Sequence, residues 1–422
     1  MKKDDLKRVV QDQSDVFRTK KGLIARDVNY KKYIETSQVV VITGVRRCGK
    51  SSLMHLFMQE MQLKISDYCY FNFDDERIIP YPSILEDIDN IHRERYGNDA
   101  ILFFDEIQNI DGWEKFVNRQ YEQGRKIFVT GSNGTLLSSE ISSSLTGRNK
   151  VLELLPFSFS EYLRFKEQSF DIDRLTRSVE SLILRQFNDF FKVGGFPLVV
   201  KENDLEILDA YFKDILYRDM ISRNNIIQIN EIKQIALYFF SNTSKLFSLS
   251  TLQKITGIKS SSSVKKYLDY YNSSYLFFYL KKFDYSVKKQ ILNPRKVYSV
   301  DQGFSNRIGF NFSENKGRIL ENIVYLELVR RKKDVYYYSN RGECDFVVQK
   351  GISIIEAFQV VYSLNHNNIE REVLGLTEAM HNFNLKDGTI IVYNVDTDTS
   401  TIPSNINIVP IWMFLLKRHS LT

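Results

Sequence analysis

The sequence predicts an α/β protein with a parallel sheet flanked by helices, and three observations carry this prediction. Residues 39–42 form an unbroken β-branched run, Val-Val-Val-Ile, as expected for a strand that is buried on both faces. A glycine-containing loop follows that run directly, and apolar residues at helical spacing follow the loop. A second apolar run, residues 101–104, ends in two acidic residues. Strands that alternate with helical segments are typical of parallel sheets.

The loop after the first strand has the spacing of a phosphate-binding loop. Gly44 opens the pattern G-x-x-x-x-G-K-S, which closes at Gly49, Lys50 and Ser51. Its backbone N–H groups would point at phosphate oxygens, and the helix N-terminus adds a favourable dipole. We expect ATP here, with Lys50 on the β- and γ-phosphates and Ser51 on Mg²⁺. An ordinary glycine-rich turn is the alternative. The expected nucleotide-binding residues of the loop are Gly44, Val45, Arg46, Arg47, Cys48, Gly49, Lys50, Ser51 and Ser52.

The acidic pair after the second apolar run points to hydrolysis. Asp105 and Glu106 follow residues 101–104 directly. In a parallel sheet, ligands bind outside the carboxyl ends of the strands, so we expect Asp105 beside Ser51. There Asp105 would hold Mg²⁺ through water, and Glu106 would orient and polarise the attacking water.

Polar residues after a third predicted strand, residues 126–131, add further candidates. Ser132 and Asn133 fall where a side chain can contact the γ-phosphate or the attacking water. Their alternative role is to cap a helix that begins near residue 135. We favour catalysis for Asn133 and leave both roles open for Ser132. Arg148 would stabilise the transition state, from its own or a neighbouring subunit, or would only complement a helix dipole.

Five motifs occur in order in the first 165 residues, namely Gly-Val-Arg-Arg-Cys-Gly-Lys-Ser, Phe-Phe-Asp-Glu-Ile-Gln, Thr-Gly-Ser-Asn, Leu-Thr-Gly-Arg and Leu-Pro-Phe-Ser-Phe-Ser-Glu-Tyr. Together they resemble the AAA-type ATPases of the "archaeal ATPase" group, which carry a C-terminal domain of unknown function. The resemblance implies an AAA core in which Asn133 matches the sensor position and Arg148 is a finger-like arginine. It also implies that Pro197, in Gly-Gly-Phe-Pro, contacts adenine from a helical lid. A helix stop with a rigid turn is the alternative for that segment.

Charge and composition narrow the class of protein. Between residues 230 and 300, eleven Lys and one Arg face three acidic residues, a local balance of +9 within a net charge of +6. Such asymmetry predicts an anionic partner at this segment, although a solvated lysine-rich surface is the alternative. No apolar run approaches the roughly 18 residues that span a bilayer. A charged N-terminus without an apolar continuation, and three scattered cysteines, predict a cytoplasmic protein without a membrane partner.

We expect four domains from the order of the predicted elements. They are a P-loop AAA-type ATPase core at 1–165, a helical lid at 166–228, a winged-helix domain at 229–304 and a nuclease-like domain at 305–422. Three helices with a glycine-containing turn and then a two-stranded ribbon predict the winged helix. The lysines expected to contact DNA there are Lys265 and Lys266 on the recognition helix, and Lys281, Lys282, Lys288 and Lys289 near the wing.

The last domain resembles the restriction-endonuclease-like PD-(D/E)XK scaffold, but it departs from the pattern of active enzymes. Glu321 and Asp345 match two of the acids that bind Mg²⁺ in that family. In the favoured register, Gln359 stands where the second strand acid belongs, and Val361 stands where the lysine belongs. Glu356 replaces the missing acid only in a shifted register, which reverses every side chain. We therefore expect no cleavage.

These residues together predict a Mg²⁺-dependent ATPase that couples hydrolysis to a conformational change, on or near DNA. An ATP-gated DNA nuclease and a nucleotide-switched protein scaffold without DNA binding are the alternatives. Homo-oligomer formation and a protein partner stay open at this point.

Overall fold

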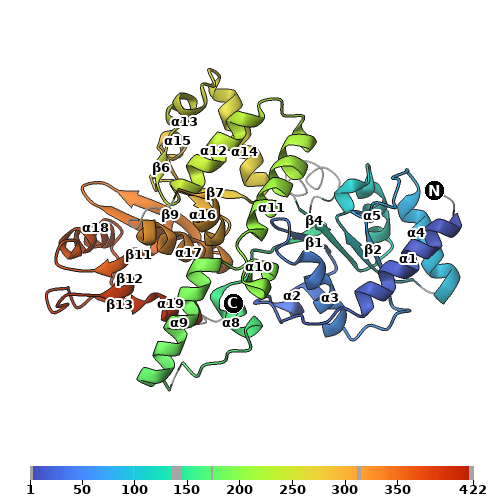
Figure 1. The fold of residues 1–422 in the computed structure, drawn as a ribbon, viewed down its shortest axis with the longest axis horizontal. Coiled ribbons are helices and arrows are strands. Elements are labelled where there is room, and N and C mark those ends of the chain that lie inside the picture. Colours follow the sequence, from blue (N-terminus) through green and yellow to red (C-terminus); the bar gives the residue numbers. More distant parts are fainter. Residues whose placement is uncertain are drawn as a thin grey trace. The chain divides into compact units, whose positions relative to one another are not determined.

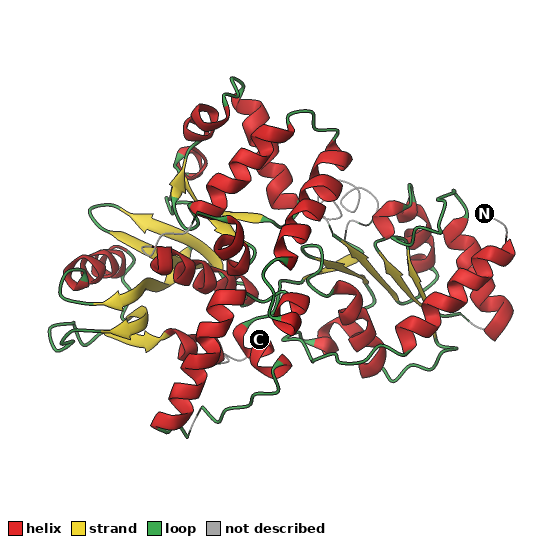
Figure 2. Ribbon diagram, in the orientation of Figure 1, coloured by secondary structure: helices red, strands yellow, loops and turns green. Residues whose placement is uncertain are grey.

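The computed structural model describes residues 3–97, 99–132, 134, 145, 147–172, 174–310 and 315–417. Its chain forms two compact units, Met1–Leu155 with Ser273–Tyr275, and Pro156–Asn272 with Leu276–Thr422. Figures 1 and 2 show the helices and strands of each unit. No helix in the described ranges combines the length and the apolar character that a membrane span requires.

The first unit is a five-stranded parallel sheet with helices on both faces, as the sequence predicted. The strand order is β2-β3-β4-β1-β5. The strands are β1 (Val39–Thr43), β2 (Tyr68–Asn72), β3 (Ile101–Asp105), β4 (Ile127–Gly131) and β5 (Asn149–Glu153). The helices are α1 (Lys3–Arg18), α2 (Tyr30–Ile34), α3 (Lys50–Glu60), α4 (Ile84–Tyr96) and α5 (Trp113–Glu122), with a 3₁₀ turn at Ile107–Asn109.

Aromatic and aliphatic side chains fill both layers beside this sheet. On one face, Trp113 of α5 packs in a cluster with Phe104 and with residues of α4. On the other face, the Phe57 ring of α3 lies 5.0 Å from that of Phe128, which stacks on Phe103 at 4.8 Å. Because both faces are covered, the strands carry continuous apolar runs rather than an alternating pattern.

Helix α1 covers the open edge of the sheet at β2. The Gln13 side chain receives a hydrogen bond from the Asn72 backbone N–H (2.7 Å) and donates one to the Asn72 carbonyl (3.1 Å). The side-chain amide thus takes the place of a neighbouring strand for this residue. Such pairing hides an edge that would otherwise bind another strand.

Most predicted elements of the first unit lie where we expected them. The strand predicted at residues 39–42 is confirmed as β1, and the helical periodicity of residues 84–96 corresponds to α4. The apolar run at 151–155 also predicts a strand, and the observed strand β5 begins two residues earlier, at Asn149. The helix expected near residue 135 lies outside the described residues.

The second unit begins with helices. They are α8 (Phe159–Phe165), α9 (Arg177–Val193), α10 (Pro197–Glu202), α11 (Ile207–Asp214), a π-helix at Ile215–Ser222, α12 (Ile229–Ser241), α13 (Leu249–Thr256), α14 (Ser261–Ser273), α15 (Val287–Leu292) and α16 (Gln302–Ile308). Strands β6 (Leu246–Phe247), β7 (Phe277–Leu280) and β8 (Arg295–Ser299) form an antiparallel sheet in the order β6-β8-β7.

A mixed five-stranded sheet forms the rest of the second unit, in the order β13-β12-β11-β10-β9. Its elements are α17 (Lys316–Arg330), β9 (Asp334–Ser339), β10 (Glu343–Lys350), β11 (Ser353–Leu364), α18 (Ile369–Asn382), β12 (Gly388–Val395), β13 (Ile406–Pro410) and α19 (Ile411–Leu416). Strands β9, β10 and β11 are antiparallel, whereas β11, β12 and β13 are parallel. The apolar run at 389–393 predicts the last strand of the chain, but β12 at that position is followed by a further short strand, β13.

Candidate functional site

The loop between β1 and α3 is shaped by its glycines. Gly44 has φ 146°, and a Cβ at this position would lie 2.1 Å from the Leu154 carbonyl oxygen. No other residue fits there without moving the backbone. Arg47, at φ 70°, and Gly49, at φ 104°, also adopt left-handed conformations. The loop therefore has the curled backbone that its sequence predicted.

Lys50 is buried at the start of α3 and points back into this loop. Its ammonium donates hydrogen bonds to the carbonyl oxygens of Gly44 (3.2 Å) and Val45 (3.3 Å). It also lies 3.5 Å from Glu106 Oε1. The sequence predicted the lysine and the acid to share one site, and the fold brings them together.

Asp105 ends β3 and is enclosed by hydroxyl groups. Its Oδ2 accepts a hydrogen bond from Tyr70 (3.1 Å), and its Oδ1 accepts one from the Thr130 hydroxyl. Ser51 also hydrogen-bonds this carboxylate. Burial and the neighbouring Glu106 raise the pKa of Asp105, against the lowering effect of these hydroxyls. Ser51 and Asp105 thus supply the oxygen ligands that Mg²⁺ prefers.

Glu106 has a strained backbone and a stabilised charge. Its φ of 53° is in the left-handed region, and its N–H donates to Thr130 Oγ1 (2.9 Å). Burial by itself would raise its pKa, but the Lys50 ammonium and the hydrogen bonds of Gln108 and Ser132 outweigh burial and lower it. Glu106 is therefore a carboxylate at neutral pH, as a proton acceptor must be.

The remaining loop residues line the turn itself. Arg46 Nη1 lies 3.3 Å from Asp74 Oδ2, whereas Arg47 is exposed and Ser52 is half-buried. Burial raises the pKa of the Cys48 thiol, so this cysteine is a poor nucleophile.

Two contacts with the loop escaped the sequence analysis. The Arg26 guanidinium donates to the carbonyls of Cys48 (3.1 Å) and Leu155 (2.7 Å). The Tyr275 hydroxyl donates to Thr43 Oγ1 (2.8 Å), at the residue before the loop. Tyr275 belongs to the short segment Ser273–Tyr275, which packs within the first unit. Neither residue lies in a motif, so only the tertiary structure reveals them.

Three predicted candidates remain on this unit. Ser132 is fully buried at the end of β4, beside Glu106, whereas Asn133 lies outside the described residues. Arg148 donates a hydrogen bond to Asn118 and lies 3.2 Å from Glu122 Oε1, both on α5. Its carbonyl accepts from the Val39 N–H (2.9 Å), at the amino end of β1. Arg148 is thus at the opposite end of that strand from the loop.

Pro197, in the second unit, begins helix α10 directly after a tight turn. The Gly195 N–H in this turn donates to Asp301 Oδ2 (2.6 Å), and a Cβ at Gly195 would lie 2.3 Å from the Phe157 carbonyl oxygen. The turn is therefore closely packed, which is compatible with the alternative of a helix stop with a rigid turn. The expected contact of Pro197 with adenine stays a prediction.

The acids predicted in the last domain lie close together. Glu321 on α17 and Asp345 on β10 lie 3.0 and 2.9 Å from the Lys296 ammonium. Gln359 Oε1 accepts a hydrogen bond from the Asp345 N–H (3.3 Å), and Val361 belongs to the apolar core. The neutral amide of Gln359 therefore stands where the second strand acid belongs, and the aliphatic Val361 stands where the lysine belongs, as the favoured register predicts.

Glu356 does not join this cluster. Its carboxylate lies 3.0 Å from Lys333 Nζ instead. The shifted register, in which Glu356 replaces the missing acid, is thus not the register of β11.

Most lysines predicted to contact DNA are exposed. Lys265 and Lys266 point outward on α14, and Lys288 and Lys289 are exposed on α15. Lys296, in contrast, is 3% exposed and contributes nothing to the surface charge.

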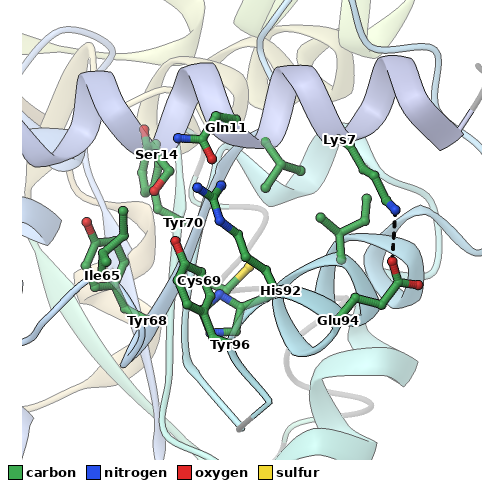
Figure 3. A pocket seen from close by; sticks show the side chains of 13 residues that line it. Lys7, Gln11, Ser14, Ile65, Tyr68, Cys69, Tyr70, His92, Glu94 and Tyr96 are labelled. Carbon is green, nitrogen blue, oxygen red and sulfur yellow. Dashed lines mark ion pairs between the residues drawn. The ribbon is translucent and has the colours of Figure 1, made fainter.

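A pocket of about 360 Å³ lies beside α1, β2 and α4 (Figure 3). An ion pair between Lys7 and Glu94 (3.0 Å) stands at its rim, and rings such as that of Tyr96 line it. No residue of the 44–52 loop lines this pocket. It is therefore distinct from the predicted nucleotide site.

A comparison with protein families supports the AAA-type core predicted for the first unit. Residues 36–163 match the family described as "AAA domain", which confirms the AAA-type core with its P-loop. Residues 184–314 match a "Domain of unknown function (DUF8612)". That second match falls in the middle of the chain and gives no support to a nuclease-like C-terminal domain.

Two curated relatives align with nearly the whole chain. "Uncharacterized protein MJ1544" of Methanocaldococcus jannaschii is 36% identical over 440 residues, with 98% of this chain and 96% of that protein covered. An "Uncharacterized protein" of Haemophilus influenzae is 30% identical over 374 residues, with 84% and 90% covered.

Similar solved structures include one protein bound to AMPPCP and one in complex with DNA. AMPPCP-bound DnaA from Aquifex aeolicus has a TM-score of 0.29 and 14% identity, with 58% of this chain and 88% of that chain covered. The Aeropyrum pernix ORC1 protein in complex with DNA has a TM-score of 0.28 and 12% identity, with 78% and 93% covered. Both scores are too low to carry an argument.

Proposed function

The chain belongs to the same family as the MJ1544 protein of Methanocaldococcus jannaschii, and we propose that it is a Mg²⁺-dependent ATPase. A single observation carries this proposal. Lys50, a serine–aspartate pair and a charged Glu106 converge at the carboxyl end of a parallel sheet, behind a curled phosphate-binding loop. This is the set of groups that phosphoryl transfer to water requires.

Each residue of the site has a proposed role that follows from its chemistry. Loop N–H groups of residues 44–49 bind phosphate oxygens, and Lys50 exchanges its carbonyl partners for a charged phosphate, a stronger acceptor. Ser51 and Asp105 would hold Mg²⁺, which would supply positive charge that neutralises the phosphates. Glu106 accepts the proton of the attacking water, with Ser132 beside it. Asn133 is the proposed sensor, and Pro197 the proposed adenine contact.

The position of Arg148 favours action between subunits. A five-residue strand separates its backbone from the loop, and at about 3.3 Å per residue this is on the order of 16 Å. Its side chain also forms an ion pair with Glu122 on α5. We infer that Arg148 completes the site of a neighbouring copy, so that the ATPase works as an oligomer.

We further propose that hydrolysis drives a conformational change that acts on DNA. The order α12, β6, α13, α14, β7, α15, β8 supports a winged helix, because three helices precede an antiparallel ribbon, whose connection contains the short helix α15. Exposed lysines on α14 and α15 supply a surface that suits phosphate. The topology around α17 and α18 supports a nuclease-like scaffold. We propose that this scaffold serves for binding rather than cleavage, because Gln359 and Val361 occupy its catalytic positions.

The test is the ATPase rate of the purified chain with and without duplex or single-stranded DNA. We expect Mg²⁺-dependent hydrolysis that DNA stimulates. Hydrolysis that DNA does not change would favour the protein-scaffold alternative, and no hydrolysis in any condition would contradict the ATPase itself. Glu60→Gln, at an exposed position late in α3, is the control for effects of substitution and purification that do not involve the site.

A further inference from the structure

A single buried ammonium group stands at the centre of three carboxylates in the second unit. Lys296 Nζ lies 2.6 Å from Glu343 Oε1, 2.9 Å from Asp345 Oδ1 and 3.0 Å from Glu321 Oε1. An ammonium has three N–H donors, and here each one has a carboxylate acceptor. The lysine is therefore fully satisfied by its own chain.

The four residues come from three separate elements. Lys296 lies on β8, the middle strand of the three-stranded sheet, Glu321 lies on α17, and Glu343 and Asp345 begin β10. Tyr298, two residues along β8, also donates to Glu321 Oε1 (2.6 Å). The cluster thus joins the ribbon of the proposed winged helix to the mixed sheet.

Three of the four residues in this cluster are buried. Lys296 is 3% exposed, Asp345 is 6% and Glu321 is 9%. Glu343 is the exception, because 42% of its side chain is exposed. Burial by itself would lower the pKa of Lys296, but the three carboxylates raise it well above its ordinary value, so the lysine stays charged.

We propose that the Lys296 ammonium is a built-in cation, which occupies the position of a divalent metal among Glu321, Glu343 and Asp345. The contacts fit an ammonium rather than Mg²⁺, because the oxygens stand at 2.6–3.0 Å and Mg²⁺ requires about 2.1 Å. Within the described ranges, no group of acidic, histidine or cysteine side chains is arranged to hold a metal. The cluster therefore connects β8, α17 and β10, and the Lys296 ammonium prevents a metal ion from binding there.

This proposal makes a prediction about the chain without that lysine. Removing the ammonium leaves the buried acids Glu321 and Asp345 and the more exposed Glu343 in close contact without a cation, which is unfavourable unless another cation replaces it. The cluster should then acquire affinity for a divalent ion. The inference concerns the second unit alone, so it stands or falls independently of ATP hydrolysis.

The experiment measures Mn²⁺ binding by electron paramagnetic resonance, and the thermal midpoint Tm with Mn²⁺ or with EDTA, in nucleotide-free protein. Lys296→Ala should have a lower Tm than wild type in EDTA, regain most of the loss with millimolar Mn²⁺, and bind one more Mn²⁺ than wild type. Adding Asp345→Asn to that variant should abolish both effects. Lys333→Ala is the matched control, because it removes a lysine that pairs with only one carboxylate, Glu356.

Two results would overturn the proposal. In one, wild type binds a Mn²⁺ ion that Asp345→Asn removes, which means that Lys296 does not exclude metal. In the other, Lys296→Ala folds but binds no additional ion. If Lys296→Ala does not fold, Lys296→Met keeps the volume of the side chain and removes only the charge. Comparing Mn²⁺ binding by wild type and by Asp345→Asn tests the proposal whether or not the Lys296 variants fold.

Discussion

At the scale of single residues, the site depends on carboxylates whose charge is controlled by their neighbours. Asp105 is buried and the adjacent Glu106 is partly buried, yet their pKa values move in opposite directions. The Lys50 ammonium lies beside Glu106 and keeps it ionised, whereas Asp105 lies mainly among hydroxyl groups. The left-handed backbone of Glu106 costs on the order of 1–3 kcal/mol, which the surrounding contacts must offset.

Replacing Glu106 by Gln should leave ATP affinity unchanged while kcat falls by about 10²-fold or more, as expected when a general base is lost. Lys50→Ala should instead weaken ATP binding itself. Nucleotide titration and steady-state kinetics separate the two effects. An unchanged kcat in Glu106→Gln would place the base elsewhere.

Asp301 allows a test of pH dependence. Burial raises the pKa of this carboxyl to about 7, although the N–H groups of Gly195 and Gly303 lower it in part. The folded chain therefore binds this proton more tightly than the unfolded chain does. Its contribution to stability is complete below the ordinary pKa and is lost as the pH rises toward about 7.

We expect the Tm of wild type to fall relative to that of Asp301→Asn between about pH 4 and pH 7. The variant is neutral throughout and lacks this titration. All other titrating groups are shared, so they cancel in the comparison. A constant difference in Tm across this range would mean that Asp301 is ionised throughout.

At the scale of elements, the basic character is concentrated on α14 and α15. Helix α14 buries Val264, Tyr267, Leu268 and Tyr271, so its lysines face outward. Helix α15 has no buried residue at all. A helix without a packed face gains little stability from its own fold, which suits a segment that meets a partner.

If these helices bind duplex DNA, affinity should fall steeply with salt, because each neutralised phosphate releases counterions. Replacing Lys265, Lys266, Lys288 and Lys289 by Gln should flatten the plot of log affinity against log salt by up to about 0.9 per lost contact. ATPase activity should persist.

The matched control replaces four exposed lysines that lie elsewhere, namely Lys31, Lys64, Lys115 and Lys201. An equal loss in both fourfold variants would indicate non-specific attraction. DNA binding that persists after the replacement of the α14 and α15 lysines would point to another surface. If wild type does not bind DNA even at low salt, a protein partner is favoured.

At the scale of the whole molecule, the proposed site needs a second copy. Arg148→Ala and Lys50→Ala should each be inactive alone, and mixing them should restore some activity. The first variant keeps an intact loop, and the second supplies the arginine. Specific activity of wild type should also rise with protein concentration.

The control mixture is Lys50→Ala with Glu106→Gln, which contains no intact site and should remain inactive. Hydrolysis that is independent of concentration, with no rescue on mixing, would exclude action between subunits.

The whole chain should not cleave DNA. Gln359 gives a neutral amide in place of a carboxylate, and Val361 cannot stabilise developing charge, a loss on the order of 3 kcal/mol or about a hundredfold in rate. We expect no Mg²⁺- or Mn²⁺-dependent cleavage of plasmid, linear or branched DNA, with or without ATP. Cleavage by wild type that Asp345→Ala abolishes would show an active nuclease.

The sequence by itself determined the parallel sheet and the chemistry of its loop. Both depend on local signals, namely continuous apolar runs and the fixed spacing from Gly44 to Ser51. Chain order also placed Glu106 near Lys50, because the carboxyl ends of parallel strands meet at one edge of a sheet. The register of β11 was predictable for a similar reason, since a period of two fixes which side chains share a face.

Only the tertiary structure decided which distant residues complete these sites. Arg26 and Tyr275 reach the loop from segments without any motif, and Arg148 lies at the far end of β1. Lys296 appeared to belong to a basic surface, yet it is enclosed by acids from α17 and β10. Local periodicity describes one element at a time, whereas the partner of a buried charge is set by how separate elements pack.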